Sequence, residues 1–142
     1  FTTNTTSNSV RNKNISLACR KLNGTIVRPG EEFSFNNTIG ERTEEKGFGA
    51  AAAYNNGEVV QEIGGGVCQV SSTLYNAVLE VPLQITEWEV HSISGVKYIP
   101  LAYDSSVGTY CDLCFTNILP FAIRLEAMTQ GGALTVLIYR AE

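Results

Sequence analysis

Apolar residues recur at helical spacing in two stretches of the chain. The first stretch predicts a helix from Ser9 to about Leu22, with Gly24 at the position of a C-terminal cap. The second runs from Val67 to Val81, where the apolar positions fall on one face at about 100° per residue, and Pro82 ends the pattern. Its apolar positions are Val67, Val70, Leu74, Ala77 and Val78. The sequence therefore predicts two main helices.

Short segments of alternating or β-branched character fill much of the remaining chain and predict strands. An Asn-Asn-Gly turn at 55–57 and a Gln-Gly-Gly turn at 130–132 each predict a hairpin, whereas residues 39–49 predict a loop that carries Arg42. The predicted strands are residues 25–27, 33–35, 50–54, 58–63, 83–90, 96–99, 109–115, 121–127 and 134–139. We expect an α+β domain with a mostly antiparallel sheet, since the regular βαβ alternation of a nucleotide-binding fold is absent.

The length of 142 residues suits one domain, and we predict that residues 1–142 form it. Acidic residues exceed basic ones, 14 against 10, for a net charge of -4, which argues against a nucleic-acid-binding protein or a polybasic membrane module. No apolar run approaches the ~18 residues of a membrane span. Because the chain begins with Phe1 rather than Met, we expect it to be part of a longer protein, with any membrane attachment in the other part.

The segment Gly64-Gly65-Gly66-Val67-Cys68 carries the main candidate for chemistry. Three glycines permit a strained turn and the close approach of another chain segment, and they deliver Cys68 to the first turn of the second helix. Unpaired N–H groups and the helix dipole at such a place favour a thiolate and an oxyanion. The alternative is that Cys68 is a small buried residue, as free cysteines often are. A phosphate-binding loop is disfavoured because no lysine follows at the required place.

His91 is the only histidine in the chain, so any mechanism that needs imidazole must use it. It follows a predicted strand, and a strand-end histidine opposite a helix-start cysteine is the arrangement that cysteine proteases and transpeptidases share. Asp104, Asp112 and Asn117 are the candidates to orient its ring. The alternative is a histidine with a purely structural role.

Cys111 and Cys114 form a Cys-x-x-Cys pair, which raises the hypothesis of a zinc site completed by Cys68 and His91. Within a strand, residues three apart point to opposite faces, so both thiols reach one ion only if a turn lies there. A disulfide between Cys111 and Cys114 is the second interpretation of the pair, and Cys19 is expected in the core. We predict no metal and no cofactor.

The residues discussed so far belong to an ordered series of motifs that spans nearly the whole chain. Its longest block runs from Gly64 to Ala77. The shorter pieces are Arg11 with Asn14-Ile15, Pro29 to Asn36, Gly40 to Thr43, His91-Ser92, Tyr98 to Pro100, Asp104, Asp112 with Phe115 and Asn117, and Leu134 to Val136. With this series the sequence resembles the VanW family, domains that are common in cell-envelope proteins of Gram-positive bacteria.

The resemblance implies an L,D-transpeptidase, because some family members use a cysteine nucleophile to form 3–3 cross-links in peptidoglycan. The catalytic residues expected from it are Cys68, His91 and Asp104. The expected substrate-binding residues are Arg42, Gly65, Gly66, Gln69, Ser72 and Tyr75. The resemblance also implies peptidoglycan stem peptides as partners, a location outside the cytoplasm at the cell surface or wall, and roles in cell-wall biogenesis and antibiotic resistance.

Two other functions stay open on the residues alone. In a non-catalytic wall-binding module, the three glycines and the polar face of the second helix would form a groove for a peptide or glycan, and Cys68 would be structural. A zinc-dependent hydrolase would need bound metal in the purified protein. Reaction of native Cys68 with iodoacetamide separates a catalytic thiol from a structural one. A nucleic-acid partner is not expected.

Overall fold

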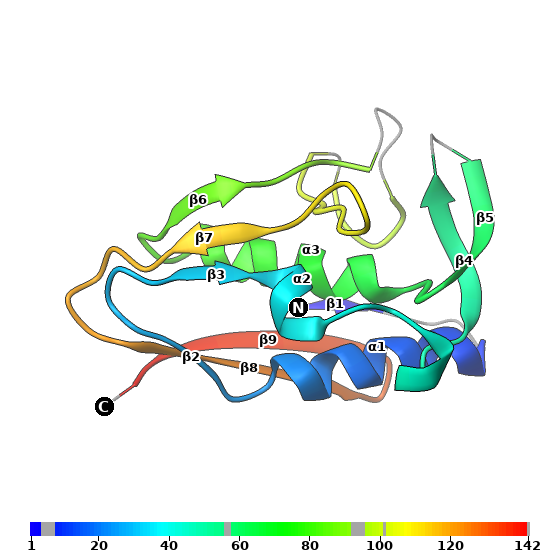
Figure 1. Ribbon diagram of the computed structural model, residues 1–142, viewed down its shortest axis with the longest axis horizontal. Coiled ribbons are helices and arrows are strands. Elements are labelled where there is room, and N and C mark those ends of the chain that lie inside the picture. The colour runs from blue at the N-terminus through cyan, green and yellow to red at the C-terminus, as the bar shows by residue number, and fades with distance from the viewer. Residues whose placement is uncertain (4–7, 56–57, 92–95, 101, 142) are drawn as a thin grey trace.

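The computed structural model describes residues 1–3, 8–55, 58–91, 96–100 and 102–141 (Figure 1). Its helices are α1 (Ser9–Leu22), α2 (Phe35–Ile39) and α3 (Val67–Leu79), with a 3-10 helix η1 (Glu44–Lys46). Its strands are β1 (Thr2–Thr3), β2 (Thr25–Val27), β3 (Glu32–Ser34), β4 (Ala50–Asn55), β5 (Glu58–Ile63), β6 (Gln84–Glu87), β7 (Cys114–Thr116), β8 (Ile123–Gln130) and β9 (Ala133–Arg140). No helix in this described part of the chain is long and apolar enough to cross a membrane.

The strands pair in three antiparallel groups. A four-stranded sheet has the order β1-β9-β8-β2, a three-stranded sheet has the order β3-β7-β6, and β4 pairs with β5 as a hairpin. Every strand pairing in the described residues is antiparallel. Helices and antiparallel sheets together confirm the α+β class predicted from the sequence.

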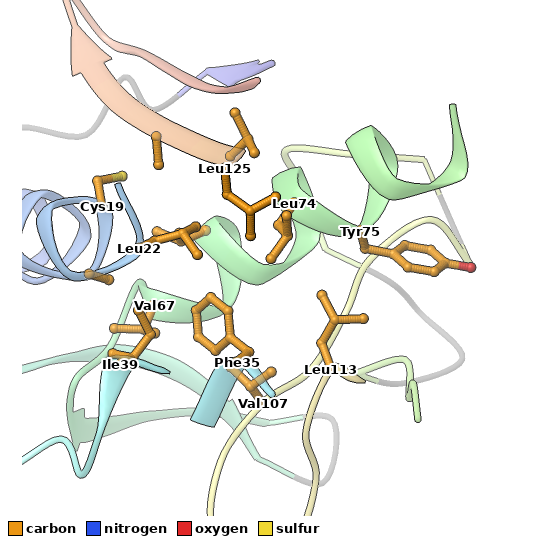
Figure 2. Packing of buried hydrophobic residues seen from close by; sticks show 14 of the residues in the cluster. Cys19, Leu22, Phe35, Ile39, Val67, Leu74, Tyr75, Val107, Leu113 and Leu125 are labelled. Carbon is orange, nitrogen blue, oxygen red and sulfur yellow. The ribbon is translucent and has the colours of Figure 1, made fainter. Parts of the chain in front are cut away.

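The core lies around α3, between the two larger sheets (Figure 1). Helix α1 packs on β8, α3 packs on β9, and the two helices also contact each other. Leu125 of β8 meets α3 from one side, while Phe35 and Leu113 meet it from the other (Figure 2). The buried side chains of α3 include Val67, Val70, Leu74 and Val78, which confirms the apolar face that the periodicity predicted. The helix is therefore held on two sides, and its N-terminus has a fixed place in the fold.

The structure corrects several local predictions. Helix α1 keeps the predicted bounds, and its N-cap is Asn8, whose side chain accepts a hydrogen bond from the Arg11 N–H. Ser34 caps the short α2 by accepting from the Asn37 N–H at 3.1 Å, so Phe35 begins a helix where its alternation with Phe33 predicted a strand. Residues 2–3, where no strand was predicted, form β1.

Three predicted strands are shorter than expected or absent. The segment 83–90 is strand only at Gln84–Glu87, and 109–115 only from Cys114. The carbonyls of Gly108 and Cys111 accept hydrogen bonds from the Asn36 side-chain amide, which holds this region as a loop. Residues 96–99 form a turn, after which Tyr103 N–H donates to the Pro100 carbonyl.

Candidate active site

The Gly64–Gly66 turn joins β5 to α3 and requires glycine for two reasons. Gly64 and Gly66 have φ values of +91° and +104°, a conformation that side chains disfavour. A Cβ atom on Gly65 would lie 2.3 Å from the carbonyl oxygen of Ala51, so this residue packs directly on the backbone of β4. The turn is thus pressed against β4 and fixes the direction in which α3 begins, as the sequence predicted.

Cys68 is the second residue of α3 and is partly exposed. Its thiol donates to the Val107 carbonyl at 3.3 Å, and the Val107 N–H lies 3.5 Å from Sγ. The backbone amides of Gly66 and Cys68 donate no hydrogen bond to any described residue. The first turn of α3 therefore presents the thiol together with two N–H donors for which the described part of the chain offers no acceptor. This is the combination that can attack a carbonyl and hold the resulting oxyanion.

His91 connects Cys68 to Asp104. Its Nδ1 lies 2.6 Å from Asp104 Oδ2, and its backbone N–H donates to the same oxygen at 2.7 Å. Cys68 also acts on His91, since it raises the pKa of the imidazole, and the two residues border the same cleft. Because Nδ1 is engaged by the carboxylate, Nε2 is the ring nitrogen left for the thiol. The structure thus brings Cys68, His91 and Asp104 together in the order thiol, imidazole, carboxylate.

The surroundings of His91 favour its protonated form. Burial alone would lower the pKa of His91, but the hydrogen bonds and charges of Cys68 and Asp104 outweigh it and raise the pKa above the ordinary 6.5. The Asp104 side chain is 0% exposed, and its Oδ1 has no hydrogen-bond partner among the described residues. A buried carboxylate is costly unless a positive charge matches it. An imidazolium at His91 supplies that charge.

The segment that carries Asp104 is anchored to the middle of α3. Ser105 N–H donates to Ser72 Oγ at 2.8 Å. The Trp88 indole N–H donates to the Asp104 carbonyl at 2.8 Å, and the Trp88 ring stacks on Tyr75 with centroids 4.9 Å apart. Ser72 and Tyr75, which the resemblance assigned to substrate, are buried in these contacts. Through these contacts they position Asp104.

A cleft of about 810 Å³ opens over the N-terminus of α3. Its walls come from the glycine turn, the hairpin β4–β5, the loops that carry Arg42 and His91, and residues 106–111. Arg42, Gly65, Gly66 and Gln69 all border it, whereas Ser72 and Tyr75 are not among the described residues that do. Four of the six expected substrate-binding residues therefore lie at one cleft with Cys68 and His91.

Gln69 has a structural role besides its place at the cleft wall. It is 1% exposed, and its amide nitrogen donates to Thr2 Oγ1 and to the Thr3 carbonyl, both at 2.9 Å. Its amide oxygen accepts from Arg11 Nη2 at 3.0 Å. Few of its hydrogen-bonding groups are left for a ligand. We therefore assign Gln69 to fixing β1 and Arg11 against α3.

The other candidates to orient the histidine ring lie elsewhere. Asp112 accepts hydrogen bonds from Ser34 Oγ and the Asn36 N–H, and Asn117 donates to the carbonyls of Val27 and Phe121.

All four cysteines are free thiols. No group of three or more His, Cys, Asp or Glu side chains in the described residues has the arrangement of a metal site. The zinc site and the Cys111–Cys114 disulfide therefore have no counterpart in this structure.

Several residues at the site were not singled out for it by the sequence. Arg11, Tyr98, Val107 and Cys111 also border the cleft. The sequence did indicate Arg11, because it is one of the residues that carry the family resemblance. Val107 forms its hydrogen bonds to Cys68 through backbone atoms, which any residue type could supply, so the sequence carries no indication of this role. Trp88 is the only tryptophan in the chain, and a tryptophan close before the only histidine was the available indication of its role.

Comparison with known proteins identifies one protein family for the chain. Residues 10–139 match the family model described as VanW like protein. The chain is 39% identical over 137 residues to the uncharacterized protein YoaR of Bacillus subtilis, a match that covers 96% of this chain and 45% of the relative. It is 32% identical over 80 residues to the vancomycin B-type resistance protein VanW of Enterococcus faecalis, covering 56% of this chain and 29% of that relative. The chain therefore spans less than half the length of these relatives. No solved structure matches it.

Proposed function

The chain belongs to the VanW family, and from this premise we propose that it is a cysteine-dependent L,D-transpeptidase that joins peptidoglycan stem peptides by 3–3 cross-links outside the cytoplasm. The observation that carries the proposal is that Cys68 and His91 border one cleft while Nδ1 of His91 lies 2.6 Å from Asp104 Oδ2. A nucleophile, a base and a group that orients the base are the parts that acyl transfer requires.

In the first half of the reaction, Cys68 Sγ attacks the carbonyl of the third, diamino-acid residue of a donor stem. His91 Nε2 holds the thiol proton, and the amides of Gly66 and Cys68 donate to the oxyanion. When the C–N bond breaks, the imidazolium passes its proton to the departing amine of the terminal D-Ala. The product is a thioester between the donor stem and Cys68, plus free D-Ala.

In the second half, the side-chain amine of another stem attacks the thioester carbonyl. His91 takes a proton from this amine as the C–N bond forms, and the thiolate leaves. Water in place of the amine gives hydrolysis, a carboxypeptidase side reaction. Asp104 touches no reacting atom and acts by holding the imidazole, so it is a positioning residue.

Incubation with a disaccharide-tetrapeptide tests the proposal, with mass spectrometry for cross-linked dimers. Wild-type protein is expected to form dimers, and Cys68→Ala none. Cys111→Ala removes the other thiol at the cleft, which has no histidine partner in the described residues, and serves as the matched control. Saturable binding of the substrate without any dimer or hydrolysis product would instead establish the wall-binding module. Iodoacetamide labelling of native Cys68 gives a second, substrate-free readout.

A further inference from the structure

Arg42 places a fixed cation at the cleft of the nucleophile. It lies in the loop between α2 and η1, and its aliphatic stem covers the glycine turn, since a Cβ on Gly64 would lie 2.8 Å from Arg42 Cγ. The residue borders the same cleft as Cys68, and the charges of the two side chains interact. Arg42 Nη2 donates to Asn36 Oδ1 at 2.9 Å and Nη1 to the Gly40 carbonyl at 3.3 Å. These two contacts fix the guanidinium plane.

Both of these partners are neutral. No carboxylate in the described residues lies within ion-pair distance of Arg42. The nearby carboxylate of Asp112 is already engaged by Ser34, the backbone amide of Asn36 and Cys114. Burial lowers the pKa of Arg42, and Cys68, Asp112 and Cys111 offset only part of this effect. Partial burial of a cation among neutral partners costs free energy of solvation. The attraction of an anionic ligand offsets this cost.

The remaining charges at the cleft are arranged differently. Glu41 and Glu62 border it but are exposed, so solvent and salt screen them. Arg11, the other arginine that borders the cleft, packs on Gly66, but its guanidinium is engaged by Gln69 Oε1 at 3.0 Å and by the Ala52 carbonyl at 3.5 Å. Arg42 is therefore the cation best placed to hold an anionic group close to the attacked carbonyl.

We propose that Arg42 binds the terminal carboxylate of the donor peptide and thereby selects donors that end one residue beyond the attacked carbonyl. This inference rests on the proposed transpeptidase function and names its donor class. The planar fork of arginine matches a carboxylate with two parallel hydrogen bonds. A peptide with one more residue carries its carboxylate about 3.8 Å farther along the chain, and a C-terminal amide removes the charge altogether.

Two tetrapeptide donors that differ only at the C-terminus, free acid against carboxamide, test the inference by their rates of acyl-enzyme formation. Wild-type protein is expected to prefer the acid by about 10- to 100-fold, the range for one charge-assisted contact. Arg42→Gln is expected to bring the ratio close to one, and Arg42→Lys to restore part of it. Arg11→Gln, the matched loss of a cleft cation, is expected to keep the wild-type ratio. A pentapeptide donor should react as slowly as the amide.

A binding measurement separates this inference from the transpeptidase proposal. Calorimetric titration of Cys68→Ala protein with each peptide needs no chemistry at the thiol, and the acid is expected to bind more tightly than the amide only while Arg42 is present. No acyl-enzyme with either donor would refute the transpeptidase function, and the titration would still decide the role of Arg42. Equal rates and affinities for acid and amide in otherwise wild-type protein would overturn the inference. So would a preference that persists in folded Arg42→Gln.

Discussion

His91 and Asp104 meet at a single oxygen atom. The backbone N–H of His91 and its ring Nδ1 both reach Asp104 Oδ2, at 2.7 and 2.6 Å. The two side chains are 3% and 0% exposed. Because one oxygen fixes both the main chain and the ring, the imidazole has little freedom to turn. Asp104 itself is held by Trp88 and by the contacts of Ser105 with α3.

We predict that Asp104→Asn changes the pH profile of the reaction. The raised pKa of His91 keeps the imidazolium populated above pH 6.5, so the alkaline limb of kcat/KM in the wild type should lie above that value. Without the carboxylate, one cause of the raised pKa is removed, and the alkaline limb should move to lower pH. Activity at neutral pH should also fall by about 100-fold or more, the range for general acid–base catalysis.

Asp112→Asn is the matched control for this substitution, because Asp112 serves Ser34 and Asn36 rather than His91. Its alkaline limb should coincide with that of the wild type. If folded Asp104→Asn protein had the same alkaline limb of kcat/KM as the wild type, the proposed positioning role of Asp104 would be wrong.

Cys68→Ala and His91→Ala should each abolish cross-linking, and the double variant should be no worse than either. Residues that act as one unit are not additive in their effects on rate. Thermal unfolding should leave Cys68→Ala close to the wild type, because Cys68 is partly exposed and lies at the edge of the core. The two variants that lack His91 should unfold at a lower temperature, because they leave the buried Asp104 carboxylate without its partner. Full activity in His91→Ala would end the proposal that the pair acts together.

Gly65→Ala should destabilise the fold and remove activity together. The added Cβ would lie 2.3 Å from the Ala51 carbonyl oxygen and 2.5 Å from its carbon, both backbone atoms of β4. Relief requires the turn or β4 to shift, at a cost of roughly 1–3 kcal/mol for an overpacked site. Denaturant unfolding measures this loss.

Gly108→Ala tests whether the steric reason is correct. Gly108 also borders the cleft, but a Cβ there meets nothing within 4 Å, and its φ is not positive. Its free energy of unfolding should stay within about 0.5 kcal/mol of the wild type, as for most unhindered substitutions. Equal stability of Gly65→Ala and Gly108→Ala would contradict the role given to the turn.

The sequence predicted those elements whose signals are local. The periodicity of α3, the glycine turn before it and the hairpin β8–β9 each depend on neighbouring residues, and the structure has them close to the expected bounds. Residues 109–113 were mispredicted because their loop depends on Asn36, which donates to carbonyls 72 and 75 positions away. No short window of sequence contains that contact.

The residues of the candidate site likewise fall into those with a local signal in the sequence and those whose surroundings depend on tertiary packing. Cys68 stood out through its glycines and helix start, and His91 through being the only histidine. Ser72 and Tyr75 lie on the helix that carries Cys68, but Ser105 and Trp88 cover them in the fold. Which residue covers a helix face is decided by the tertiary packing, which the sequence does not show. The substrate-binding role of Ser72 and Tyr75 stays a prediction, and in the fold both residues are buried.

The central claim is that Cys68 forms a thioester with the donor stem, and intact-protein mass spectrometry tests it most directly. Wild-type protein mixed with tetrapeptide donor and quenched in acid should gain the mass of the donor minus D-Ala. Peptide mapping should place the adduct on Cys68, and none should form on Cys111. Cys68→Ala should gain no mass, and His91→Ala should acylate far more slowly. An adduct that persists in Cys68→Ala, or dimer formation by wild-type protein with no acyl-enzyme at any time point, would contradict the account.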